Sequence, residues 1–275
     1  MTNNNSQLQD KLHALELWFT QRKGSIVAFS GGIDSTLVLY LARKFQGKEN
    51  AIGVISNSES LKNRDFLQAK TFCEEFDIQL EVIITKELED ERYNQNPVNR
   101  CYFCKEHLFQ DLSIISEKFP GFEVLSGTNA DDLGDYRPGM EAAKKYQVQA
   151  PFVDCNVSKE ELRQVAKHFR LPNWDKPASP CLSSRIPYNQ AVTREKLKQV
   201  ESAEEILNSY GFEDVRFRHY GDYGKIEVHK EELLKLQGVQ AEIILKIKAL
   251  GFQHCEIDEE GLVSGKMNRV LKDLK

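Results

Sequence analysis

The sequence contains no apolar run that approaches the ~20 residues needed to span a bilayer. Its start, residues 1–6, carries neither the basic residues nor the apolar stretch of an export signal. Positive charge is also scarce, because 37 Lys and Arg face 42 Asp and Glu and leave a net charge of −5. This balance argues against a partner held mainly through nucleic-acid phosphates. We therefore expect a cytoplasmic protein, with no membrane or nucleic-acid partner, that acts on a small molecule.

A glycine-rich segment at 30–36, SGGIDST, lacks both the lysine of a Walker loop and the glycine spacing of a dinucleotide fingerprint. It follows the apolar run 25–29 and precedes the helix-like run 37–42. A buried strand, a glycine turn and a helix start form an anion-binding cup, in which backbone N–H groups and side-chain hydroxyls approach phosphate oxygens. The predicted phosphate-binding residues are Ser30, Gly31, Gly32, Ser35 and Thr36.

The order Ser-Gly-Gly-x-Asp-Ser resembles the signature of the ATP pyrophosphatases, the PP-loop enzymes. The resemblance implies that the loop, with Asp34 and Ser35 in it, holds the β,γ-diphosphate of ATP. It also implies that ATP is cut between its α and β phosphates and that AMP passes to a substrate oxygen. A strand-to-helix turn without a ligand is the competing interpretation, but six matching positions in this context favour the loop. For Asp34, two interpretations stay open: it holds Mg²⁺ through water, or it caps the following helix.

Strand-like and helix-like segments alternate through the first half of the chain. This alternation predicts an α/β fold with a parallel sheet, helices on both faces, and a ligand site at the carboxyl ends of the strands, where the glycine-rich loop lies. A Ser-Lys-Glu-Glu capping box predicts a further helix start at Ser158. The predicted strands are 25–29, 51–55, 80–84 and 122–126, and the predicted helices are 65–76, 105–117 and 158–169.

A stretch rich in Pro and Ser at 172–188 predicts a loop or linker. Beyond it, two helical patterns flank a predicted hairpin, and 275 residues suffice for two domains with sizeable cores. We therefore expect a PP-loop ATP pyrophosphatase domain with the cysteine site at 1–188. A smaller α+β domain at 189–275 is expected to serve substrate binding or oligomerisation. Its predicted helices are 195–210 and 231–250, and its predicted strands are 215–219 and 225–228.

Cysteine placement gives the second strong pattern. Cys101 and Cys104 form a Cys-x-x-Cys pair at a predicted helix start, where the helix dipole favours thiolates. In a cytosolic chain this spacing is more often metal or redox chemistry than a disulfide. Cys181 is the best third ligand because it lies in the polar linker. Cys73 and Cys255 have apolar or strand-like neighbours, so we expect them to be structural thiols.

Three thiolates are compatible with two metal sites. Zn²⁺ would take His107, three residues after Cys104, as the fourth ligand of a Cys₃His set. A four-iron, four-sulfur (4Fe-4S) cluster normally takes four cysteines, so three would leave one iron open, and that position could hold a sulfide. His107 is also compatible with an ordinary polar residue on a helix surface. From the residues alone, both metal sites stay open.

Four segments together resemble the LarE family over nearly the whole chain. LarE proteins are PP-loop sulfur transferases that help to build the nickel-pincer nucleotide, the cofactor of lactate racemase. The resemblance implies that pyridinium carboxylates of a mononucleotide are adenylated with ATP and converted to thiocarboxylates. The matching segments are SGGIDST at 30–36, GTNADDLGDYRPG at 127–139, SSRIPY at 183–188 and SGKMN at 264–268.

The sulfur source that the resemblance implies depends on the cysteines. In one branch of the family, a cysteine in a Cys-Ser-x-Ser-Ser-Arg context gives up its own sulfur. Here Pro180 stands at that position and Cys181 comes one place later. In a second branch, three cysteines bind an open 4Fe-4S cluster, and Cys101, Cys104 and Cys181 match it. We therefore expect a cluster fed by a separate sulfide donor in place of a sacrificial cysteine.

The resemblance also implies nucleotide contacts. Gly127 and Thr128 end a predicted strand beside the loop, where their backbone can meet AMP. Asp131 and Asp132 have two interpretations: they carry a metal, or they fix the loop as an ordinary turn after a strand.

In the tail, LarE uses arginines of a matching Val-Arg-x-Arg stretch for the substrate phosphate, and guanidinium forks suit phosphate oxygens. From the pattern alone, alternating arginines would form a solvated strand face and isolated glutamates would lie on the surface. The implied substrate-binding residues are Ser184, Arg185, Glu204, Arg216, Arg218 and Glu227.

Other functions share parts of this pattern. PP-loop tRNA thiolases also combine three cysteines with a cluster, but the sequence lacks a basic aromatic platform for RNA. An ammonia-using NAD or GMP synthetase would leave the cysteines unexplained. A zinc-stapled nucleotide-binding protein without turnover is the alternative outside enzymes. We expect a sulfur transferase that uses ATP and Mg²⁺ and forms homo-oligomers.

Overall fold

The structure, a computed structural model, describes residues 2–134, 137–263 and 265–271. Asp135, Tyr136 and Ser264, which belong to two of the motifs above, lie outside the described residues. Within the described residues, no helix is both long and apolar enough to cross a membrane.

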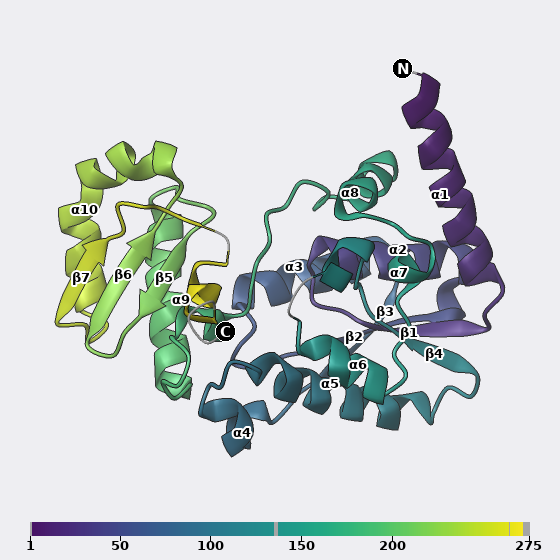
Figure 1. Cartoon of the computed structure of the whole chain (residues 1–275), viewed down its shortest axis with the longest axis horizontal. Helices are drawn as coiled ribbons and strands as arrows, with labels where there is room; N and C mark the ends of the chain where they lie inside the picture. The colour runs from purple at the N-terminus through teal and green to yellow at the C-terminus, as the bar shows by residue number, and fades with distance from the viewer. Residues whose placement is uncertain (1, 135–136, 264, 272–275) are drawn as a thin grey trace. The chain divides into compact units, whose positions relative to one another are not determined.

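The chain forms two compact units (Figure 1). The first comprises Met1–Glu87 and Cys101–Ser179, and the second comprises Leu88–Arg100 and Pro180–Lys275. The sequence placed the division after residue 188 and did not separate Leu88–Arg100 from the first half. Two backbone hydrogen bonds explain why this segment belongs to the second unit: Asn189 N donates to Asn96 O at 2.9 Å, and Val192 N donates to Asn94 O at 2.7 Å.

The first unit contains a parallel four-stranded sheet in the order β3-β2-β1-β4. Its strands are β1 (Gly24–Ala28), β2 (Ala51–Ser56), β3 (Gln79–Ile83) and β4 (Phe122–Leu125). Each strand begins within one residue of the predicted one, and the parallel pairing confirms the predicted α/β class. The loop 30–36 follows β1, so it lies at the carboxyl edge of the sheet.

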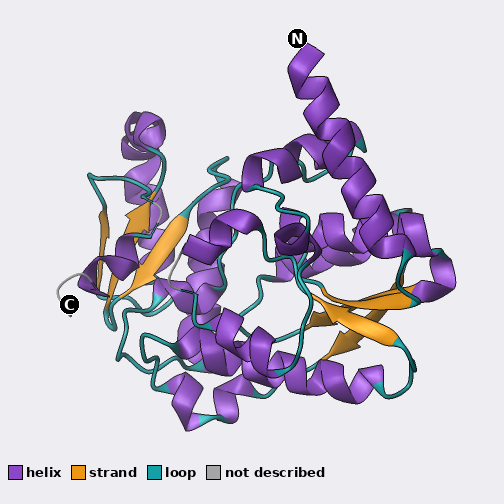
Figure 2. Cartoon of the chain, turned by 45° about the vertical axis from the view of Figure 1, so that its right-hand side comes forward, coloured by secondary structure: helices purple, strands orange, loops and turns teal. Residues whose placement is uncertain are grey.

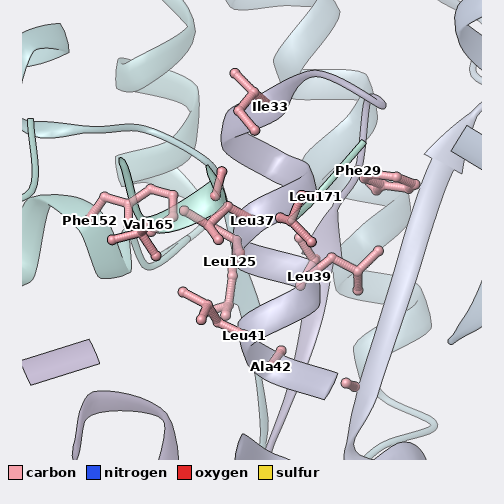
Figure 3. Packing of buried hydrophobic residues seen from close by; sticks show 14 of the residues in the cluster. Phe29, Ile33, Leu37, Leu39, Leu41, Ala42, Leu125, Phe152, Val165 and Leu171 are labelled. Atoms are coloured by element: carbon pink, nitrogen blue, oxygen red, sulfur yellow. The ribbon is translucent and has the colours of Figure 1, made fainter. Parts of the chain in front are cut away.

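Both faces of this sheet are covered by helices, as predicted (Figures 1 and 2). Successive strand residues point to opposite faces. Accordingly, Val27 of β1 joins one apolar cluster, while its neighbours Ile26 and Ala28 join the other. Figure 3 shows the first cluster, in which Leu37 and Leu125 pack together. The helices over the first cluster include α1 (Thr2–Thr20), α2 (Ile33–Gln46), α3 (Asn63–Glu75), α7 (Pro151–Asp154) and α8 (Lys159–His168), and those over the second include α5 (Arg100–Ser116) and α6 (Gly139–Lys145).

The predicted capping box of α8 is present. Ser158 Oγ accepts a hydrogen bond from Glu161 N at 3.2 Å, and Glu161 Oε2 accepts one from Ser158 N at 2.9 Å. These bonds satisfy two donors that a helix start leaves open, so they fix where α8 begins.

The second unit is α+β, as predicted. Its sheet has the order β5-β6-β7: the β5–β6 pair is the predicted antiparallel hairpin, and β7 adds in parallel. Leu236, Ile243 and Ile247 of α10 are fully buried and lie on one helix face. The elements are α4 (Glu91–Asn94), α9 (Arg194–Ser209), β5 (Arg216–His219), β6 (Tyr223–Glu227), α10 (Leu233–Lys248), β7 (His254–Ile257) and the 3₁₀ helix η4 (Leu182–Arg185).

Candidate functional site

The glycine-rich loop has the geometry of an anion cup in the first unit. Gly31 has φ +71°, and a Cβ there would lie 3.2 Å from both Ala69 Cβ and Asp65 O, so only glycine fits without strain. Gly32 is the N-cap of α2, and Thr36 N donates to Gly32 O at 2.9 Å. The first N–H groups of α2 therefore have no acceptor within the helix, and they can donate hydrogen bonds to an anion held in the loop.

The loop hydroxyls have different roles. Ser35 Oγ accepts from Ser30 N and donates to Gly32 O, both at 3.1 Å. Ser35 and Thr36 are buried, whereas Ser30 is exposed. Ser35 therefore maintains the shape of the loop, and the exposed Ser30 has its Oγ 3.1 Å from Ser35 Oγ.

Asp34 is paired with a lysine that the sequence analysis missed. Lys159 Nζ lies 2.6 Å from both carboxylate oxygens of Asp34, and Asn129 Nδ2 donates to Oδ1 at 3.3 Å. The helix-cap interpretation of Asp34 is wrong, because Gly32 is the N-cap and Asp34 sits in the first turn. The side chains of Lys159 and Asp34 remain 36% and 30% exposed, so a ligand can reach both. The capping box marked the helix start beside Lys159, but no local pattern pairs residues 125 positions apart.

The end of β4 packs closely on the loop. A Cβ at Gly127 would lie 2.7 Å from Ser35 N and 2.9 Å from Asp34 Cβ, so a larger residue would push the two segments apart. This contact places the Gly127 backbone beside the anion cup. Thr128 Oγ1, in turn, lies 3.1 Å from Ser126 Oγ.

Asp131 and Asp132 both hold the loop after β4. Asp132 Oδ2 accepts from Asn129 N at 3.0 Å, and its Oδ1 lies 2.6 Å from Arg137 Nη2. Asp131 Oδ2 accepts from Lys159 N at 2.8 Å. These contacts fit the loop-fixing interpretation and also hold the backbone of Lys159.

The polar stretch before Pro180 is anchored to the loop, a link that no sequence pattern indicated. Asn173 Nδ2 donates to Gly31 O at 3.3 Å and to Thr36 Oγ1 at 2.9 Å. Asp65 accepts from Lys176 Nζ at 2.9 Å and from Ser179 Oγ at 2.6 Å. Burial raises the pKa of Asp65, but the bonds from Lys176 and Ser179 outweigh it and lower the pKa below its ordinary value.

Cys101 and Cys104 are the second and fifth residues of α5, which begins at Arg100, five residues before the predicted helix 105–117, and their i, i+3 spacing puts them on one face. Cys181 directly precedes η4 and belongs to the second unit, whereas Cys101 and Cys104 belong to the first. Over the described residues, no group of three or more His, Cys, Asp or Glu side chains is placed to hold a metal ion. The pair on α5 suits two ligands of a metal site, while the three-cysteine set stays a prediction. His107 lies one turn further along α5, and the zinc alternative stays open with it.

Two other cysteines have the character of structural thiols. Burial, with Glu74 nearby, raises the pKa of Cys73 to about 12, and burial, with Glu256 nearby, raises the pKa of Cys255 to about 12. Both are therefore protonated thiols at neutral pH, unsuited to bind a metal.

A cluster of buried charges occupies the second unit. Arg185 is fully buried, and its Nε and Nη2 donate to the two oxygens of Glu204 at 2.7 and 3.2 Å. Glu204 Oε1 also accepts from Phe217 N at 3.1 Å. Glu204 is thus a buried anchor for an arginine, and its interpretation as a surface residue is wrong because η4 and β5 pack against α9.

The strand arginines are buried as well. Arg218 Nη2 donates to Glu227 Oε2 at 2.7 Å, and its Nη1 donates to Ser184 O at 2.9 Å. Arg218 Nε is buried and has no hydrogen-bond partner within the described part of the chain. Arg216 pairs with Asp214 at 2.6 Å, and burial, together with the charge of Arg185, lowers its pKa.

These contacts overturn two interpretations made from the pattern alone, the solvated strand face and the surface position of Glu227. No pattern in the sequence gave Lys266 a role, yet its Nζ lies 3.4 Å from Glu227 Oε1 and 2.8 Å from Asp258 Oδ2. In the second unit, Arg185 and Arg218 therefore both contact Ser184, and the buried carboxylates of Glu204 and Glu227 pair with them.

The parallel sheet and the glycine cup between β1 and α2, in a loop without a Walker lysine or the dinucleotide glycine spacing, fit the PP-loop class. Consistent with this class, the family described as NAD synthase matches residues 6–100.

The chain is similar to three known proteins, of which the first shows the family. The chain is 33% identical over 245 residues to the pyridinium-3,5-bisthiocarboxylic acid mononucleotide synthase of Lactiplantibacillus plantarum, with 89% of each chain covered. It is 39% identical to a protein of Synechocystis sp. across 96% of this chain and 99% of that one. It is 37% identical to the NH(3)-dependent NAD(+) synthetase of Pyrococcus horikoshii across 59% of this chain and 64% of that one. The Lactiplantibacillus plantarum synthase is a LarE protein, and this chain therefore belongs to the LarE family.

Proposed function

We propose that this protein is an ATP-dependent sulfur transferase that converts the carboxylates of a pyridinium mononucleotide to thiocarboxylates for a nickel-pincer cofactor. The main support is the anion cup at the start of α2 in a chain that matches the Lactiplantibacillus plantarum synthase over 89% of its length. The proposed partners are the mononucleotide, a sulfide donor and further copies of the chain, in the cytoplasm.

The proposed reaction has two steps for each carboxylate. A carboxylate resists attack because its oxygens are anionic and leave poorly. In the first step its oxygen attacks the α-phosphorus of ATP, the bond to the β-phosphate breaks, and pyrophosphate leaves. In the second step sulfide attacks the carbonyl carbon of the acyl-adenylate, the carbon–oxygen bond to AMP breaks, and the thiocarboxylate forms with release of a proton.

The first unit offers the groups for adenylation. Backbone N–H groups at the start of α2 and the exposed Ser30 hydroxyl bind the diphosphate. Lys159 supplies the cation that the loop itself lacks. Gly127 brings its backbone to AMP. Asp34 is the carboxylate that would hold Mg²⁺, and the ion would supply positive charge for the leaving pyrophosphate.

The second unit offers a site for the phosphate of the mononucleotide. Arg216 and Arg218 lie on one side of β5, and Arg218 Nε has a free proton inside the described structure. Ser184 lies against Arg218 through its carbonyl oxygen. Glu204 and Glu227 hold Arg185 and Arg218 by charge-assisted hydrogen bonds.

For the sulfur step, we propose that Cys101, Cys104 and Cys181 would hold a 4Fe-4S cluster, which would supply iron able to carry a sulfide. The exposed thiol of Cys181 suits delivery to a substrate that arrives from solvent.

The test supplies anaerobic protein with ATP, Mg²⁺, sulfide and pyridinium-3,5-biscarboxylic acid mononucleotide. AMP, pyrophosphate and a thiocarboxylate should form together, and AMP should form only when the mononucleotide is present. ADP and phosphate as products, or no thiocarboxylate, would contradict the proposal.

A second candidate is an ammonia-using NAD synthetase, which the match of residues 6–100 to the NAD synthase family favours. It would adenylate the carboxylate of deamido-NAD⁺ and use ammonia as the nucleophile. Supplying deamido-NAD⁺ and ammonia in the same assay separates the two candidates, because only a synthetase releases AMP and NAD⁺ under those conditions.

A further inference from the structure

The segment Leu88–Arg100 clasps the loop that carries Cys181 within the second unit. Asn96 is fully buried at φ +57°, and its Nδ2 donates to the carbonyl oxygens of Ile186 and Pro187 at 3.2 and 2.7 Å. Tyr93, also buried, has its hydroxyl 2.7 Å from Ser183 Oγ. An insertion from the first half of the chain thus holds the residues that directly follow Cys181.

Arg100 is the last residue of this segment, and its side chain contacts the sulfur atom of Cys181. Its Nη1 donates to Asn96 Oδ1 at 2.5 Å and to Ser183 O at 2.9 Å. Its Nη2 lies 4.0 Å from Cys181 Sγ, within contact distance for an N–H group and sulfur. Arg100 is only 5% exposed, whereas Cys181 is exposed. One side of Sγ therefore faces a buried cation, and Sγ remains accessible from solvent.

A guanidinium is suited to this arrangement because its N–H donors are fixed in one plane. Here the two carbonyl-type oxygens fix the plane through Nη1 and leave Nη2 directed at sulfur. The groups that transfer sulfur, thiolate and sulfide, carry negative charge and gain from a charged donor. A neutral donor, or a lysine with a single mobile ammonium, would hold the sulfur less firmly.

We propose, on the basis of the proposed function, that Arg100 is the positioning residue for sulfur transfer. Its guanidinium fixes Cys181 Sγ in place and donates to the anionic sulfide delivered beside it, which is the sulfur that attacks the carbonyl carbon of the acyl-adenylate. It takes no part in adenylation, whose proposed groups all belong to the first unit.

The test separates the two steps of the reaction in the full-length anaerobic protein. Pyrophosphate release is measured with ATP and the mononucleotide in the absence of sulfide, and thiocarboxylate formation is measured after sulfide is added. In Arg100→Gln, we expect pyrophosphate release within about twofold of wild type and thiocarboxylate formation slowed at least about tenfold. Arg100→Lys keeps the charge but loses the fork, so it should recover part of the rate.

Tyr93→Phe is the matched control. It removes a hydrogen bond of the same clasp without touching sulfur, so both steps should stay near wild type. Full sulfur transfer in Arg100→Gln would overturn the inference, as would equal losses in Tyr93→Phe and Arg100→Gln. A wild-type protein that forms no thiocarboxylate would instead overturn the proposed function, and the role of Arg100 with it.

Discussion

Lys159 supplies, from another part of the chain, the positive charge that the loop 30–36 lacks. Its ammonium spans both oxygens of Asp34 at 2.6 Å. Without that cation, the Asp34 carboxylate would repel a bound diphosphate at the start of α2. The pair is partly exposed, so it contributes no more than about 1 kcal/mol to folding stability. Its importance should therefore appear in ligand binding.

We predict that Lys159→Gln weakens the binding of inorganic pyrophosphate at least about tenfold, or about 1.4 kcal/mol, with little change in thermal stability. Isothermal titration calorimetry with and without Mg²⁺ measures the affinity, and thermal unfolding measures the stability. Lys167→Gln, a change near the end of the same helix, is the control and should leave the affinity unchanged. Unaltered pyrophosphate binding in Lys159→Gln would show that Lys159 only neutralises the charge of Asp34 and does not bind the diphosphate.

His219 gives the second unit a pH-dependent stability. It is 2% exposed, its Nε2 lies 3.0 Å from Gln199 Oε1, and its Nδ1 accepts from Gly221 N at 3.1 Å. Burial lowers the pKa of His219 to about 4 from an ordinary 6.5. Below pH 6.5 the unfolded chain takes up a proton at this residue, whereas the folded chain does not until about pH 4. Stability should therefore fall as the pH decreases between these values, by about 3 kcal/mol at most.

We predict that His219→Gln flattens this part of the stability–pH curve, because glutamine does not titrate. Urea unfolding at a series of pH values between 7 and 4 measures the effect. His254→Gln, at an exposed position of β7, should keep the wild-type slope. An unchanged slope in His219→Gln would show that other groups cause the acid sensitivity.

The stretch between α8 and Pro180 connects the anion cup to the residues just before Cys181. Asn173 contacts the loop, and Lys176 and Ser179 contact Asp65, whose backbone oxygen lies next to Gly31.

We predict that Asp65→Asn, which replaces a charged double acceptor by an amide, increases amide hydrogen exchange at 172–179 and raises the KM for ATP several-fold. Asp77→Asn, beyond the C-terminal end of α3 and paired with Arg43 and Lys48, should change neither. Normal exchange in Asp65→Asn would show that Asn173 alone holds the stretch.

Most elements of this protein could be predicted from local patterns, because their signals are themselves local. The capping box at Ser158 and the loop 30–36 specify their own backbone geometry, and the two central strands β1 and β2 are short buried runs. The strand β7 was missed because it has only four residues and none of their side chains is fully buried, so the alternation of apolar and polar residues that marks a strand is weak. The position of Leu88–Arg100 was missed because it depends on Asn189 and Val192, about a hundred residues away.

The site could be predicted only in part for the same reason. Residue types at 30–36 indicated anion binding, since their chemistry is visible in one short segment, whereas the anion-binding role of Arg216 and Arg218 came from the family resemblance and not from the pattern. Pairings across the chain, such as Asp34 with Lys159 or Arg100 with Cys181, carry no local signal. The burial of Glu204 and Glu227 follows from the packing of α9, η4 and β5, so it too emerges only in the folded chain.

For the molecule as a whole, the identity of the sulfur source decides whether it is a repeated catalyst or a single-use reagent. If Cys181 ligates iron, its Cβ–S bond need not break, and external sulfide can be transferred many times. Anaerobically purified protein should then hold about four irons per chain, which Cys101→Ala, Cys104→Ala or Cys181→Ala should each remove. One zinc per chain in colourless protein would favour the Cys₃His alternative.

We predict that intact mass is unchanged after many turnovers with sulfide. A sacrificial Cys181 would attack the acyl-adenylate and then lose its sulfur by elimination at Cβ. The residue would become dehydroalanine, and the chain would lose the mass of hydrogen sulfide. Mass spectrometry of the protein before and after reaction distinguishes the two mechanisms, and a reaction without ATP is the control. Loss of one sulfur per chain at Cys181, with activity that stops after a single turnover, would establish the sacrificial mechanism despite the shifted position of the cysteine after Pro180.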